Sequence, residues 1–137
     1  MAGILKINSL TDADTSKNVG AEYITQGTAK AWAKLDGTGT IAIDGSLNYT
    51  SSTDNAVGDY SLTLTSALND ANYSLQVSGV SRQTASSHVQ CVGFHTADDV
   101  NAGTYSTTQH RFSNKASFAT GYIDIAAATT TVHGDLA

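Results

Sequence analysis

Histidine is the residue type with the widest chemical range in this sequence, and it occurs at His88, His95, His110 and His133. A protein metal site needs at least three converging ligands. Neither an HxH nor an HxxxH spacing is present, and His88 and His95, seven positions apart, would face opposite sides of a continuous strand. We therefore predict no metal ion and no other cofactor, with histidines that face solvent or lie in loops.

The adjacent acids Asp98 and Asp99 are a second candidate for chemistry, because they lie in a polar, loop-like stretch. Such a pair can bind calcium or provide half of a two-carboxylate hydrolase site, although adjacent acids in a polar loop are usually solvated turn residues. The sequence has no Gly-x-Ser-x-Gly nucleophile motif and no phosphate-binding loop. We predict no catalytic residue and no enzymatic activity. The enzyme alternative is a glycan-cleaving depolymerase that uses Asp98 and Asp99.

Charge and composition exclude several classes of partner. The chain carries a net charge of −5, and its seven Lys and Arg residues are scattered, so no basic stripe is available for nucleic acid. The longest apolar run, residues 125–128, is far shorter than the roughly 18 residues of a membrane helix, so no membrane insertion is expected. A single cysteine, Cys91, excludes an intramolecular disulfide framework.

The elements that must position these residues are strands. From residue 28 onwards, apolar and polar residues alternate in short runs that end at Gly, Asn or Asp, which is typical of half-buried antiparallel strands. About eight or nine strands are predicted, over residues 29–35, 40–43, 47–49, 60–65, 72–78, 88–94, 105–112, 118–125 and 129–133. The prediction is an all-β domain over residues 28–137, an antiparallel β-sandwich of the jelly-roll-like kind.

Two details of this domain are predicted from the pattern. The strands at 60–65 and 72–78 are each apolar on one side, and the short link between them predicts that they are neighbours in one sheet. Trp32 lies between two lysines on what should be the polar face of its strand. It is either a core residue of a strand buried on both faces or the anchor of a subunit interface.

The first 27 residues differ from the rest, because one apolar cluster precedes a polar stretch with little to bury. The cluster comprises Ile4, Leu5, Ile7 and Leu10. Either this segment is a flexible leader, or the cluster packs against another chain or another protein, since four large aliphatic residues would otherwise be exposed.

Several motifs resemble a signature of short tail-fibre, head-fibre and related virion proteins of tailed bacteriophages, especially those of aquatic bacteria. The main one is GTAKAWAKLDGTGTIAI at residues 27–43, which continues in TDNAVGDYSL at 53–62 and NDANY at 69–73. The opening ILKINSLT at 4–11 and the closing HGDLA at 133–137 are also similar to that group. The likeness covers both ends and about half of the chain, while residues 82–118 have no counterpart.

The resemblance implies a homotrimer in the virion, with residues 1–27 attached to a capsid, neck or tail component and the β-domain pointing outward. The short leader leaves no room for a long shaft, so a short fibre or spike is expected, with a host-surface glycan as a further partner. Residues 82–118 are the predicted receptor surface. The alternative is a decoration or cement protein that stabilises the capsid. The resemblance supplies no catalytic residue.

Overall fold

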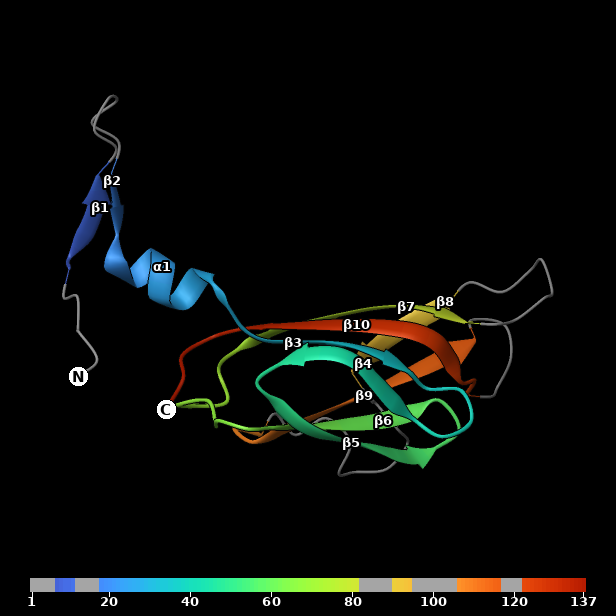
Figure 1. Cartoon of the computed structure of the whole chain (residues 1–137). Coiled ribbons are helices and arrows are strands. Elements are labelled where there is room, and N and C mark those ends of the chain that lie inside the picture. The colour runs from blue at the N-terminus through green and yellow to red at the C-terminus, as the bar shows by residue number, and fades with distance from the viewer. Residues whose placement is uncertain (1–6, 12–17, 82–89, 95–105, 117–121) are drawn as a thin grey trace.

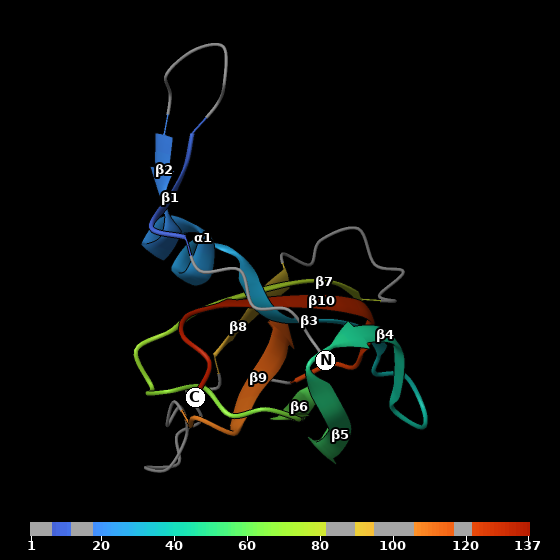
Figure 2. The ribbon, with the colours of Figure 1, turned by 60° about the vertical axis from the view of Figure 1, so that its left-hand side comes forward.

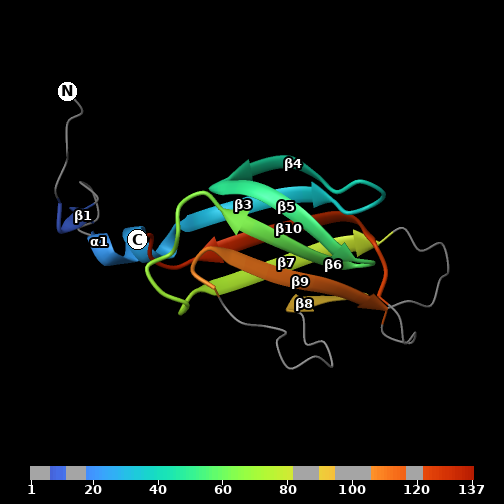
Figure 3. The same cartoon turned by 90° about the horizontal axis from the view of Figure 1, so that it is seen from below.

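Eight strands of the chain form two four-stranded antiparallel sheets that stack face to face (Figures 1 and 3). The computed structural model describes residues 7–11, 18–81, 90–94, 106–116 and 122–137. The first sheet has the order β4 (Ala42–Leu47), β3 (Ala29–Asp36), β10 (Ile125–His133) and β7 (Ser74–Ser81). The second has the order β5 (Tyr49–Ala56), β6 (Asp59–Leu64), β9 (Gln109–Ala116) and β8 (Gln90–Phe94). The predicted all-β, jelly-roll-like sandwich is confirmed in its class.

Alternation along the strands separates the core from the surface. In β3, Ala31, Ala33 and Leu35 are buried while Trp32 and Lys34 between them are exposed. In β6, the apolar residues Tyr60, Leu62 and Leu64 lie in the core between the two sheets. The fully buried side chains of the core include Tyr60, Phe112, Leu35, Leu62, Ile125 and Val132. Burial of a side chain of this size contributes about 1.5–3 kcal/mol to folding, so these positions hold the sandwich together.

The predicted pairing of the strands at 60–65 and 72–78 is wrong. β6 lies in the second sheet and β7 in the first, so the two strands belong to opposite sheets and form no ladder. The link between them crosses from one sheet to the other with Leu68 buried, and the Leu68 amide donates a hydrogen bond to the carbonyl of Thr107 (2.8 Å). A single apolar face on each strand fits either arrangement, because both arrangements bury that face.

Two predicted strands in the C-terminal half have different bounds. β9 begins at Gln109 rather than at residue 105, and β10 begins at Ile125, so residues 122–124 of the predicted strand 118–125 form a connection instead. In that connection, Asp124 Oδ1 accepts a hydrogen bond from the amide of Gly58 (2.9 Å). Asp124 therefore fixes a turn in the other sheet, which a strand-like pattern of residue types does not reveal.

The N-terminal residues form an arm that projects from one end of the sandwich (Figures 1 and 2). The arm contains a hairpin of β1 (Ser9–Thr11) and β2 (Asn18–Gly20), followed by the helix α1 (Ala21–Gly27). No residue of α1 is buried. The sequence predicted neither the hairpin nor the helix, because both are too short for a periodic signal.

Candidate interaction surfaces

The arm exposes large apolar side chains on both of its elements. Leu10 and Val19 are opposite each other across the hairpin and are 53% and 42% exposed, and Tyr23 on α1 is 71% exposed. Ile7, just before the hairpin, is exposed as well. Ile7 and Leu10 were predicted from the sequence to pack against a partner, and within the described chain nothing buries them. Val19 and Tyr23 were not predicted, because single apolar residues in a polar stretch give no pattern.

The predicted residues Ile4 and Leu5 lie outside the described residues. The described part of the arm has little stability of its own, because its hairpin and its helix are both short. A two-stranded hairpin of this length is marginal in water at best, and isolated helices shorter than about 12 residues are also marginal. An exposed apolar arm of this kind is typical of a segment that binds another protein.

The arm is tied to the sandwich at its base. His133, at the end of β10, donates a hydrogen bond from Nδ1 to the carbonyl of Gly27 (3.0 Å). The amide of Thr28 donates to the carbonyl of Ile24 (3.2 Å) and ends the helix. These bonds fix the point where α1 passes into β3.

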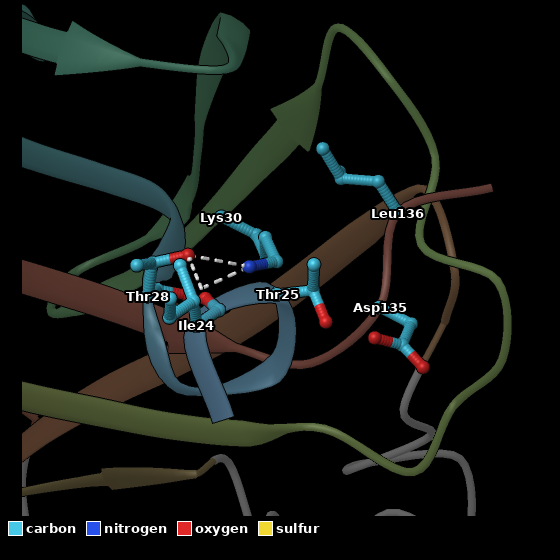
Figure 4. A pocket seen from close by; sticks show the side chains of 6 residues that line it. All are labelled: Ile24, Thr25, Thr28, Lys30, Asp135 and Leu136. Atoms are coloured by element: carbon cyan, nitrogen blue, oxygen red, sulfur yellow. Dashed lines mark hydrogen bonds between the residues drawn. The ribbon is translucent and has the colours of Figure 1, made fainter. Parts of the chain in front are cut away.

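A shallow hollow lies beside this junction (Figure 4). It is lined by Ile24, Thr25, Thr28, Lys30, Asp135 and Leu136. The Lys30 ammonium turns toward Thr28 and donates to its carbonyl (3.1 Å) and to its hydroxyl (2.7 Å). Asp135 lies on the C-terminal segment across from Lys30. One cation that is already hydrogen-bonded and one carboxylate, in an open site, do not form a catalytic arrangement.

Trp32 lies on the outer face of the first sheet. It is 43% exposed, which excludes the interpretation as a core residue and leaves the interface anchor open. Its ring lies over Gly45 of β4, where a Cβ would stand 3.7 Å from two of the indole carbons. Leu47 is directly opposite Trp32 in the ladder and is 49% exposed. Trp32 and Leu47 therefore form one apolar patch on the surface.

An ion pair between Lys34 and Asp44 lies beside this patch. Lys34 Nζ donates a hydrogen bond to Asp44 Oδ2 at 2.8 Å, and both side chains remain about half exposed. The hydrogen bond and the charge of Asp44 raise the pKa of Lys34. The pair therefore balances charge locally on this face.

His110 contradicts the prediction that the histidines face solvent. It is 2% exposed, and its Nε2 lies 3.0 Å from the hydroxyl of Tyr49, whose ring meets the imidazole edge-on. Thr130 donates a second hydrogen bond to the Tyr49 hydroxyl (3.4 Å). Burial lowers the pKa of His110 to about 4 and raises the pKa of Tyr49 to about 12, so both groups are neutral at pH 7. This trio is a polar contact inside the core.

Tyr60 is a second buried tyrosine, and it joins the two sheets. Its hydroxyl accepts a hydrogen bond from the amide of Ile125 (3.1 Å), and it lies 3.1 Å from the carbonyl of Gly37 and 3.1 Å from Asp124 Oδ1. Burial raises the pKa of Tyr60 to about 12. A Cβ at Gly37 would lie 2.5 Å from the Tyr60 ring, so this approach requires glycine.

The outer face of the second sheet is occupied by the chain's own side chains. Arg111 binds Asp59 through Nε (2.7 Å to Oδ1) and Nη2, which is a bidentate ion pair. Asn55 Nδ2 donates to Ser61 Oγ (2.8 Å). Asp59 and Ser61 are consequently buried although they point away from the core. This face is therefore closed at its centre.

Four further candidates for chemistry from the sequence lie outside the described residues, namely His88, His95, Asp98 and Asp99. Within the described ranges, no three His, Cys, Asp or Glu side chains come close enough to hold a metal ion. Over the same ranges, no helix has the length and apolar character needed to cross a membrane. No protein-family model, no curated protein and no solved structure matches this sequence.

Proposed function

We propose that this chain is a non-enzymatic structural protein of a bacteriophage particle. It forms a short trimeric fibre or spike, in which residues 1–27 attach to a capsid, neck or tail component. The sandwich projects outward and contacts the host surface. The observation that supports this proposal best is the arm, which exposes Leu10, Val19 and Tyr23 on elements that have almost no stability of their own.

The energetics of the arm favour an attachment role. Burial of a leucine or valine side chain contributes about 1.5–3 kcal/mol, so a partner that covers Leu10 and Val19 gains binding free energy and orders the hairpin at the same time. The hydrogen bond between His133 and Gly27 joins the arm to the sandwich, so an attached arm would also orient the sandwich. These properties suit a module held by one end.

The surface of the sandwich suits contact with a neutral, hydroxyl-rich partner. The chain contains 15 serines and 19 threonines, and the exposed positions of β5 include Thr50, Ser51 and Thr53. Neutral hydroxyls exchange hydrogen bonds with sugar hydroxyls at a modest net gain for each bond. The resemblance of residues 27–43 to phage fibre proteins favours a host-surface glycan as this partner.

The position of the protein on the phage particle tests the proposal. Cryo-electron microscopy of the particle that carries this chain should show the sandwich outside the neck or tail, connected through the arm. Density over the capsid lattice axes would favour the decoration protein instead. Absence of the chain from purified particles would refute both structural roles.

The arm can be tested separately with charged variants. Leu10→Asp combined with Val19→Asp should abolish incorporation into particles while the sandwich unfolds at the wild-type temperature. Val57→Asp is the matched control, since Val57 is an exposed aliphatic residue on the sandwich (60% exposed) and its change should leave incorporation intact. Normal incorporation of the double variant would contradict attachment through the arm.

A further inference from the structure

The register of the first sheet can be followed across all four of its strands, so the residues of its outer face can be placed in rows. Trp32 and Leu47 form its apolar patch at the β3–β4 side. In the same row, Trp32 is opposite Thr131 of β10, and Thr131 is opposite Gln76 of β7. This row therefore runs from an apolar side to a neutral polar side.

On β10 and at Ser78 of β7, the next rows of the same face carry short side chains. Lys34 is opposite Thr129, and Thr129 is opposite Ser78. Beyond them Ala127 is opposite Val80, which is 64% exposed. The face thus has a second apolar patch at its β7 side, diagonally across from Trp32 and Leu47, with short hydroxyl side chains between the two patches.

Charge favours a second copy of the chain as the occupant. Each copy carries a net charge of −5, so two copies approach most easily through faces whose charges are balanced. On this face Lys34 and Asp44 already neutralise each other. A strongly charged partner would therefore find no free charge on Lys34 or Asp44 beside the patch.

Shape also favours a protein surface over a small ligand. Ligand sites are concave, whereas this face is the outer side of a sheet and its residues lie in the rows of the ladders. The small residues Thr129, Thr131 and Ser78 allow another protein surface to approach closely. The corresponding face of the second sheet is already covered by Arg111 and Asn55.

We infer that copies of this chain contact each other through the outer face of the first sheet, with Trp32 as the anchor. The inference rests on the proposed trimer. Two different apolar patches on one face suit a contact in which Trp32 and Leu47 of one copy meet Val80 and Ala127 of the next. Contacts of this head-to-tail type close into a ring where the rotation between copies allows it, and three copies make the smallest such ring.

Trp32 provides the test, because it is the only tryptophan of the chain. Light scattering of the full-length protein should give three times the mass of one 14.2 kDa chain. In the same samples, the fluorescence of Trp32 should have its maximum at a short wavelength and should resist quenching by acrylamide. Dilution to the single-chain mass should shift the emission to longer wavelength and make the ring accessible to the quencher.

A pair of variants locates the contact. Leu47→Arg should reduce the mass threefold and expose Trp32, because it places an unpaired charge in the proposed interface. Val57→Arg is the matched control, an exposed aliphatic residue in the turn between β5 and β6, and it should remain trimeric. Circular dichroism and thermal unfolding of both variants establish that each is folded.

The outcomes separate this inference from the trimer itself. A trimer in which Trp32 remains fully open to acrylamide, or which survives Leu47→Arg, would overturn the interface and leave the trimer standing. A single-chain mass at every concentration would overturn both. Shielding of Trp32 by an added oligosaccharide in the single chain, with no trimer at any concentration, would show that the patch is a ligand site instead.

Discussion

The arm and the sandwich of this chain use apolar residues in opposite ways. In the sandwich, Leu62, Phe112 and Ile125 are fully buried between the sheets. In the arm, Leu10, Val19 and Tyr23 are exposed and α1 has no buried residue. The sandwich therefore buries a hydrophobic core of its own, whereas the large apolar side chains of the arm stay exposed within the described chain.

This difference predicts that stability depends on the sandwich and attachment on the arm. Substitutions in the sandwich should change the free energy of unfolding, and substitutions in the arm should change binding while unfolding stays constant. The predictions below test that division, beginning with the largest effect on stability.

Leu62→Ala should lower the free energy of unfolding by about 3 kcal/mol, because it removes buried methyl groups and leaves a cavity in the core. Leu10→Ala should change it by less than about 0.5 kcal/mol, as is usual for an exposed position. Urea unfolding monitored by circular dichroism measures both values. Similar losses from the two variants would show that the arm packs as part of the folded core.

Acidification should destabilise the sandwich through His110. The folded-state pKa is lowered to about 4 from 6.5, so below pH 6.5 the unfolded chain binds a proton that the folded chain does not. The stability that the neutral histidine provides is fully present above pH 6.5 and is lost as the pH falls to 4. The loss should amount to about 3 kcal/mol.

His110→Gln is the control for this titration, because glutamine can still meet the Tyr49 hydroxyl and does not ionise. Unfolding free energies measured from pH 7 to pH 4 should fall less steeply in the variant. Carboxylates titrate in both proteins, so the difference between the two curves isolates His110. Parallel curves would mean that the imidazole takes up its proton without unfolding the core.

Gly37→Ala should lower the free energy of unfolding by about 2 kcal/mol, because a Cβ would be placed 2.5 Å from the buried Tyr60 ring. Gly27→Ala, at the end of α1, is the matched change in the arm, where no atom lies within 4 Å of the added carbon. It should leave thermal unfolding unchanged. A stable Gly37→Ala variant would show that the Tyr60 ring can shift freely.

His133→Ala should have a small effect on stability, at most about 1 kcal/mol, since it removes one hydrogen bond at the junction of the two regions. Its main consequence should be a looser arm, measured as faster chymotrypsin cleavage after Tyr23. Thr129→Ala on the same strand is the control and should be cleaved at the wild-type rate. Equal rates for both variants would show that the hydrogen bond does not hold the arm.

The class of the fold follows from the sequence because alternation is a local signal. In β3, the order of Ala31, Trp32 and Ala33 already separates the core from the surface. The pairing of β6 with β9 instead of β7 does not follow, because a short link fits a hairpin as well as a crossing between sheets. Only the long-range contacts of Leu68 with Thr107 and Leu136 decide between them.

The candidate surfaces were predictable only in part for the same reason. The exposure of Leu10 and Trp32 fits simple patterns, namely an isolated apolar cluster and an aromatic residue on a polar face. The burial of His110 fits no such pattern. A histidine in a strand is expected to face solvent unless its partner is known, and the partner Tyr49 lies far away in the sequence. α1 is missed because seven residues without a side-chain N-cap give too little signal.

The position of β10 has a consequence for how the chain is made. β10 pairs with β3 on one side and with β7 on the other, and it is the last strand in the sequence. During synthesis β3 and β7 therefore wait without their common partner until residues 125–133 have left the ribosome. Folding dominated by such distant pairings is slow and exposes strand edges meanwhile. A chain cut short before Ile125 should thus remain unable to close the first sheet, so only chains that include β10 become available for assembly.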